Sequence, residues 1–160
     1  MSRLQAQIAS ILQGTFADEG FAIGGGLGLQ AHGVIDRESA DIDAYTATFD
    51  PKAFIRVEQK VMDRISDAGL LVSVSRALDV FREFIVCDPI SNEQTTVDLG
   101  YDHRDYPPTV LANIGPVLKL DLSNRLETSF MAWWSNRLIH YPWKSLGIPS
   151  RLVESAGFAV

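Results

Sequence analysis

The chain has 160 residues and a net charge of −6, and 46% of its residues are hydrophobic. We expect one compact domain over residues 1–160 and exclude an intrinsically disordered chain. No stretch approaches the ~20 consecutive apolar residues that cross a bilayer, and the single cysteine, Cys87, excludes an internal disulfide framework. The acidic balance argues against a broad nucleic-acid face. The N-terminus lacks the layout of a signal peptide, so a cytoplasmic protein with no membrane partner is expected.

Hydrophobic spacing predicts the first half of the fold. A helix is predicted over residues 4–16, ending near Gly20, and a short strand over residues 21–23. The glycine run 24–26 follows, then a short helix from Leu27 to His32. Residues 34–40 are polar and turn-like, and residues 41–46 alternate as a strand. Asp50-Pro51 begins a helix that ends at Gly69, because Asp is a favoured N-cap and Pro is favoured at the first helical position. The basic residues that recur on this helix are expected to form a solvated face: Arg56, Lys60 and Arg64.

The second half is richer in strands. Three are predicted over residues 70–75, 80–87 and 95–101, and a further short one over residues 117–120. A last helix is predicted over residues 121–138. Because strands follow one another late in the chain, we predict an α+β fold, in which a mixed sheet carries helices mainly on one face.

A pair of carboxylates stands out on the strand over residues 41–46. Asp41 and Asp43 project to one side of it, because successive side chains in a strand alternate between faces. Two neighbouring carboxylates repel each other and so favour a bound cation. Magnesium prefers such oxygen ligands, and two ions can clamp both ends of a phosphoryl displacement. Asp98 would add a third ligand or a general base if its strand lies alongside. An Asp-x-Asp pair is also common at exposed strand ends, and that interpretation stays open.

The run Gly24-Gly25-Gly26 has two interpretations. Glycines between a strand and a helix let backbone N–H groups approach a phosphate. The simpler interpretation is a tight turn with close packing. The run is neither a Walker A loop nor a dinucleotide-binding fingerprint, because no Gly-Lys-Ser/Thr follows and Asp41 comes too soon.

These features occur in one order: Gly25-Gly26, a short helix, Arg37-Glu38-Ser39-Ala40-Asp41-Ile42-Asp43, and Asp98 on a later strand. This order resembles the nucleotidyltransferase superfamily, which has the DNA-polymerase-β-like fold. Within it, the Gly-Gly pair and the Arg-x-Ser-x-Asp-Ile-Asp block look closest to the AbiEii/AbiGii toxin-type family. The resemblance covers residues 20–46 well and residues 95–101 more loosely.

The resemblance implies a role for each matching residue. Gly25 and Gly26 would cradle a triphosphate, while Arg37 and Ser39 would contact phosphate or position the loop. The three carboxylates would bind magnesium and catalyse transfer: Asp41, Asp43 and Asp98. The implied step is attack by a hydroxyl on the α-phosphorus of a nucleoside triphosphate (NTP). In related toxins the acceptor is often RNA, notably transfer RNA.

The resemblance weakens toward the C-terminus. The family's lysine on the helix after the sheet is missing, and Lys119 is the nearest substitute for a phosphate contact. No Arg-Asp pair follows, so the part from about residue 121 is expected to be short or divergent. Three hypotheses remain: an active toxin-type enzyme with an antitoxin partner, a non-catalytic nucleotide- or partner-binding relative, and an antitoxin-type nucleotidyltransferase that modifies a partner protein. The aromatic tail also suggests a homodimer.

Overall fold

The computed structural model describes residues 1–36, 39–104 and 106–119. Its helices are α1 (Arg3–Glu19), α2 (Gly25–Ala31) and α3 (Pro51–Asp67). Its strands are β1 (Phe21–Ile23), β2 (Asp41–Thr46), β3 (Leu71–Leu78), β4 (Phe81–Cys87), β5 (Gln94–Tyr101), β6 (Thr109–Leu111) and β7 (Gly115–Val117). Within these residues, no helix has the length and apolarity needed to cross a membrane.

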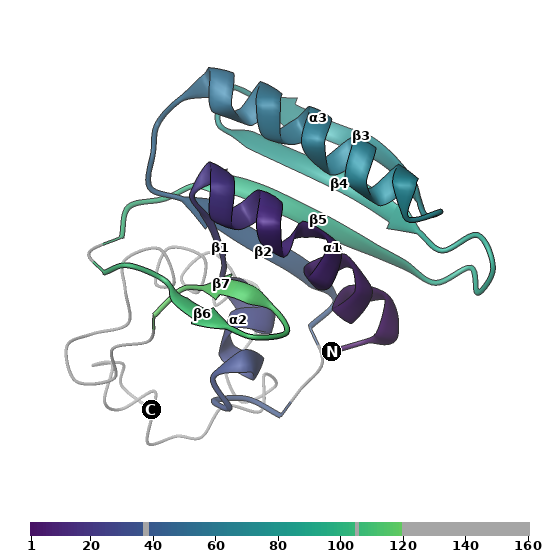
Figure 1. Ribbon diagram of the computed structural model, residues 1–160, viewed down its shortest axis with the longest axis horizontal. Coiled ribbons are helices and arrows are strands. Elements are labelled where there is room, and N and C mark those ends of the chain that lie inside the picture. Colours follow the sequence, from purple (N-terminus) through teal and green to yellow (C-terminus); the bar gives the residue numbers. More distant parts are fainter. Residues whose placement is uncertain (37–38, 105, 120–160) are drawn as a thin grey trace, which may run out of the picture.

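The described strands form one sheet in the order β3-β4-β5-β2-β1-β7-β6. β2 is parallel to β5 and antiparallel to β1, while β1 is parallel to β7, so the sheet is mixed. The two long helices, α1 and α3, run side by side across one face (Figure 1). The predicted α+β class, with helices mainly on one face, is confirmed.

α1 has well-defined ends. Ser2 accepts a hydrogen bond from the backbone N–H of Gln5, whose side chain accepts one from the Ser2 N–H in return, and this capping box fixes the start. Gly20 ends the helix in the left-handed conformation at φ 72°. Most of the apolar stripe that sequence periodicity predicts is buried against the sheet and α3, and only Ile11 is partly buried; the buried residues are Leu4, Ile8, Leu12 and Phe16.

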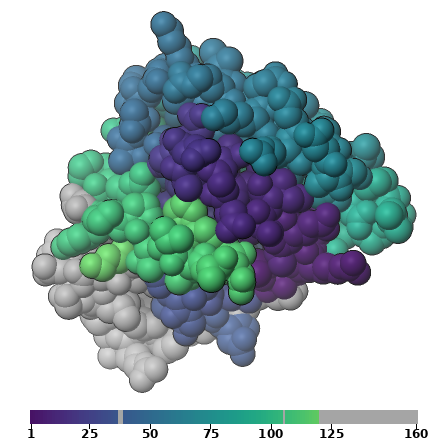
Figure 2. Space-filling view, viewed as in Figure 1, coloured from purple at the N-terminus to yellow at the C-terminus, as the bar shows by residue number. Residues whose placement is uncertain are grey.

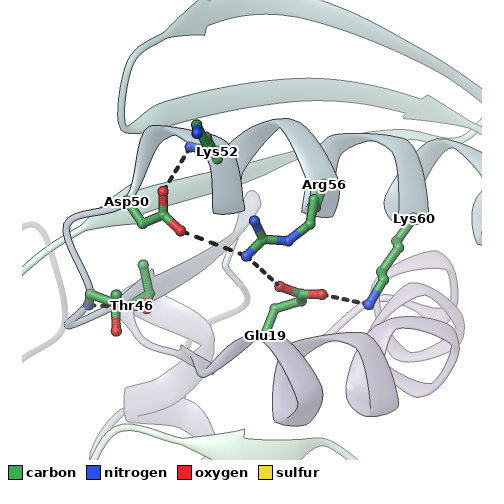
Figure 3. A network of polar contacts seen from close by, with 7 residues as sticks. Glu19, Thr46, Asp50, Lys52, Arg56 and Lys60 are labelled. Atoms are coloured by element: carbon green, nitrogen blue, oxygen red, sulfur yellow. Dashed lines mark hydrogen bonds and ion pairs between the residues drawn. The ribbon is translucent and has the colours of Figure 1, made fainter.

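α3 begins at the predicted cap, where Asp50 accepts a hydrogen bond from the N–H of Lys52 at 2.9 Å. Ion pairs then join α3 to the end of α1, as Figure 3 shows: Arg56 and Lys60 both reach Glu19. The side chains of Arg56 and Lys60 are 55% and 48% exposed, which confirms a solvated face for them. Both cations, however, already have acidic partners within the fold.

The β6–β7 hairpin packs against α1, and in Figure 2 its side chains lie beside those of α1. Gly115 makes this approach close. It has φ +91°, and a Cβ there would fall 2.7 Å from the Cβ of Gln13. A side chain at position 115 would therefore push the hairpin off the helix.

The structure corrects several element boundaries. α2 begins at Gly25 rather than Leu27. Glycine has a low helix propensity, but the close contact with β2 leaves no room for a side chain at position 25. β6 was not predicted, and β7 spans residues 115–117 instead of 117–120. Both are three-residue strands near prolines, too short for alternation to reveal. The predicted helix over residues 121–138 lies outside the described residues.

Candidate active site

Two of the three predicted carboxylates are direct neighbours in the sheet. β2 and β5 pair in parallel, with Asp43 opposite Asp98 and Asp41 opposite Thr96. Paired residues project from the same face of a sheet, and neighbouring strands lie ~4.8 Å apart. Ile42 between the acids is fully buried, on the face that packs against the long helices. The conditional prediction that the Asp98 strand lies beside the Asp41 strand is therefore confirmed.

The carboxylates of β2 are largely removed from solvent. Asp41 is 8% exposed and Asp43 is 3% exposed. Asp41 Oδ1 accepts a hydrogen bond from the Ser39 hydroxyl at 2.9 Å. Burying a charged carboxylate is costly unless hydrogen bonds or an opposite charge compensate, and a second carboxylate alongside adds repulsion. A cation bound beside these neighbouring carboxylates would therefore stabilise them.

The glycine run lies directly against Asp43 and Ser39. The Gly24 N–H donates to the Asp43 carbonyl at 2.9 Å. Gly25 has φ +55°, and a Cβ there would fall 1.9 Å from Asp43 Oδ2. A Cβ on Gly26 would fall 2.6 Å from the Ser39 Oγ. Close packing against Asp43 and Ser39 is sufficient reason for both glycines, and their role in cradling phosphate stays a prediction.

Two further residues belong to this face, and neither was singled out from the sequence. The ring of Tyr45 lies between two glycines: Cβ atoms on Gly24 and Gly100 would fall 3.0 Å and 3.2 Å from it. Burial raises the pKa of the Tyr45 hydroxyl, and the negative charges of four aspartates raise it further: Asp43, Asp102, Asp98 and Asp41. The phenol therefore stays protonated and faces a strongly negative region. Asp102 adds a fourth acid to it, just after the end of β5.

The predicted phosphate-contacting cations have different outcomes. The Lys119 Nζ lies 5.1 Å from the centre of the Tyr106 ring, as a cation–π contact. The preceding Leu118 N–H donates to the Ile23 carbonyl at 2.8 Å, so Lys119 leaves the sheet near the glycine run. Arg37 lies outside the described residues. His32, read from the sequence as a helix-end residue, donates from Nε2 to the Leu118 carbonyl at 2.8 Å, which is a structural bond.

The donor set fits magnesium in its chemistry, because all three predicted ligands are carboxylates. Among the described residues, however, no three His, Cys, Asp or Glu side chains come close enough together to hold a metal ion as they stand. Magnesium commonly takes one or two protein carboxylates and completes its shell with water and substrate phosphate. The Asp43–Asp98 pair meets that smaller requirement, and the metal role of the three aspartates stays a prediction.

Asp102 makes the stability of the protein depend on pH. Burial raises its pKa above the usual 3.8, and the N–H and charge of His103 offset this only in part. The folded state therefore holds the proton more tightly than the unfolded state, so the Asp102 contribution to stability falls as pH rises above about 3.8. We expect Asp102→Asn to raise the melting temperature modestly at pH 7 and less at pH 4. Melting curves of both proteins at both pH values test this, and a gain that is equal at the two pH values would contradict it.

No protein-family model matches the chain, and no curated protein matches it either. Among solved structures, it is similar to JHP933 from Helicobacter pylori, at 17% identity and a TM-score of 0.49. It is also similar to an H. pylori protein whose assignment as a nucleotidyltransferase is itself provisional, at 17% identity and a TM-score of 0.48. Each match covers 74% of this chain, but only 53% and 55% of the other chains. The chain therefore matches about half the length of either protein, and a likeness at this level assigns it no family and no activity.

Proposed function

We propose that the chain is a magnesium-dependent nucleotidyltransferase, which moves a nucleoside monophosphate from an NTP to a hydroxyl acceptor. The observation that carries the proposal is the pairing of Asp43 with Asp98 on parallel strands, with Asp41 on the same face. The Gly25 backbone lies against Asp43 of this pair, so a bound triphosphate could meet the carboxylates and the glycine run together. The short resemblance over residues 20–46 supports the same activity.

In this proposal Asp41, Asp43 and Asp98 would hold two magnesium ions, which when bound would neutralise the charge on the transferred phosphoryl group. The acceptor oxygen forms a bond to the α-phosphorus, the bond from that phosphorus to the bridging oxygen breaks, and pyrophosphate leaves. Asp98 takes the proton of the attacking hydroxyl.

The residues around the carboxylates have supporting roles in the proposal. Ser39 orients Asp41 through its 2.9 Å hydrogen bond. Gly25 and Gly26 allow the backbone to approach the triphosphate, because neither has a side chain to exclude it. Arg37 and Lys119 contact its phosphates. Lys119 would have to leave the ring of Tyr106 to do so.

The finer part of the proposal concerns the acceptor. By resemblance to the AbiEii/AbiGii family, we propose RNA, and transfer RNA in particular, as the acceptor of a toxin from a toxin–antitoxin or phage-defence system. An antitoxin protein would then be the partner. The net charge of −6 suggests that RNA is held by a local contact rather than a broad basic face.

A non-catalytic nucleotide- or partner-binding domain is the second candidate. It is favoured by the lack, among the described residues, of three acidic or other ligating side chains already gathered for a metal. In that case Asp43→Asn would leave both folding stability and ligand binding unchanged.

Labelled transfer tests the proposal. The protein is incubated with magnesium, cellular RNA, lysate protein and each NTP labelled at the α-phosphorus. We expect label in one macromolecule, and none with the Asp41→Ala/Asp43→Ala double variant. The same NTP labelled at the γ-phosphorus is the control, because it labels the acceptor only in a kinase reaction. Label in protein instead of RNA would favour the antitoxin-type enzyme, and no label in any incubation would contradict nucleotidyl transfer.

A further inference from the structure

A polar residue in the first turn of α1, Gln5, is buried instead of facing solvent. Gln5 is only 2% exposed, whereas the other buried residues of α1 are mostly apolar. Burying a carboxamide is unfavourable unless its donors and acceptor find partners. Gln5 finds them in three segments of the chain. Its Oε1 accepts from the Ser2 N–H at 3.0 Å, and its Nε2 donates to the Ser39 carbonyl at 2.9 Å and, more weakly, to the Thr95 hydroxyl at 3.5 Å.

One partner of Gln5, Ser39, lies just before β2, the strand that carries Asp41 and Asp43. The Ser39 carbonyl accepts the hydrogen bond from Gln5, and the Ser39 hydroxyl donates one to Asp41 Oδ1 at 2.9 Å. The next carbonyl, that of Ala40, accepts from the Thr95 hydroxyl at 3.0 Å. Two hydrogen bonds, joined through Ser39 itself, therefore form a chain from the start of α1 to the Asp41 carboxylate.

This chain limits the freedom of the segment that orients Asp41. A Ser39 carbonyl held by Gln5 fixes the peptide plane between Ser39 and Ala40. The Ser39 Oγ is confined as well, because it packs closely against Gly26. A Cβ added to Gly26 would fall only 2.6 Å from it. Outer partners of this kind hold a ligand in one orientation, and their loss typically reduces metal affinity or activity about 10- to 100-fold.

We propose that Gln5 is a positioning residue of the candidate active site: its side-chain amide holds Ser39, and through Ser39 it sets the orientation of Asp41. The inference deepens the proposed nucleotidyltransferase function and rests on it for its catalytic consequence. Gln5 acts only through the backbone of Ser39.

The test uses three variants, which separate the bond to Ser39 from the capping box. Gln5→Met keeps the length of the side chain but loses both the capping box and the bond to Ser39. Ser2→Ala loses the Ser2 hydroxyl of the capping box and leaves the Gln5 amide in place. Gln5→Glu is the third variant. It keeps an acceptor for the Ser2 N–H, and so the capping box, but has no amide donor for Ser39.

Amide hydrogen exchange measures how firmly the segment over residues 39–43 is held, whether or not the protein has catalytic activity. We expect Gln5→Met and Gln5→Glu to speed exchange of the amides over residues 39–43 roughly tenfold. Ser2→Ala should affect only the first turn of α1. Unchanged exchange over residues 39–43 in either Gln5 variant that folds would overturn the proposal. So would an equal effect of Ser2→Ala there, because the cause would then be the helix start.

Kinetics separates this inference from the proposed function. If the wild type transfers nucleotide, both Gln5 variants should lower kcat about 10- to 100-fold, while the KM for the NTP changes less than about threefold. A full kcat in these variants would overturn the positioning role. If the wild type transfers nothing, the proposed function fails, and hydrogen exchange still decides whether Gln5 holds the segment.

Discussion

Gly25→Ala is expected to lower the free energy of unfolding by about 2–5 kcal/mol. A left-handed conformation at a non-glycine residue costs roughly 1–2 kcal/mol, and overpacking of a buried site adds about 1–3 kcal/mol. Turning the Asp43 side chain away would not relieve the contact. The new methyl group would fall 1.9 Å from Asp43 Oδ2, but also 2.9 Å from the Asp43 Cβ, which rotation about the side chain cannot move. α2 or β2 must therefore shift.

The matched control for this variant is Gly33→Ala. Gly33 has a similar positive φ of +69°, but a Cβ there would meet nothing within 4 Å. Gly33→Ala should therefore lower the free energy of unfolding only by the conformational cost, about 1–2 kcal/mol. Urea unfolding of both variants measures the difference, provided that the slope with denaturant stays the same. Equal losses at the two positions would mean that the close contact with Asp43 contributes nothing.

Arg82→Met is expected to cost about 3 kcal/mol of stability, which places it among the larger effects of a single substitution. Arg82 is 6% exposed on β4. Its guanidinium group pairs with Glu58 of α3 and donates to the carbonyls of Leu78 and Phe81, so it joins the β3–β4 turn to the helix layer. Removing it leaves two carbonyls and a carboxylate without this donor. Because the Glu58 side chain is 33% exposed, water can replace part of the loss.

Two further variants identify the cause. Arg82→Met/Glu58→Met should recover part of the stability lost in Arg82→Met, because replacing a whole buried ion pair with apolar groups is often close to neutral. Lys60→Met removes a half-exposed ion pair with Glu19 and should cost no more than about 1 kcal/mol. Chemical unfolding of the four proteins provides these values. If the double variant were less stable than Arg82→Met, the unpaired Glu58 charge could not be the cause of the lost stability.

Local chemistry was enough to predict the long elements. The apolar spacing of α1, the Asp50-Pro51 start of α3 and the alternation of β2 each depend on near neighbours in sequence. The face shared by Asp41 and Asp43 follows from the same alternation. Long-range order was beyond this reasoning. That β5 pairs with β2, and in the register that places Asp98 beside Asp43, depends on contacts across more than fifty residues.

The residues that sequence reasoning missed share one property: their roles arise from contacts distant in sequence. Gln5 looks like an ordinary polar residue in the first turn of a helix, and its burial depends on Ser39 and Thr95. Tyr45 looks like a strand aromatic, and its position depends on glycines at 24 and 100. A weak signal existed for Tyr45, because it continues the alternation of Asp41 and Asp43 by two residues.

We propose that the carboxylates of β2 and β5 bind a magnesium–nucleotide complex. Calorimetric titration with a non-hydrolysable NTP, with and without magnesium, measures this directly. Asp63→Asn is the matched control, because Asp63 is an exposed acid on α3 that accepts a hydrogen bond from its helix neighbour Gln59. We expect binding that requires magnesium, is at least about tenfold weaker in Asp43→Asn and Asp98→Asn, and is unchanged in Asp63→Asn. Binding that is equally strong in all four proteins, or absent from the wild type, would contradict this proposal.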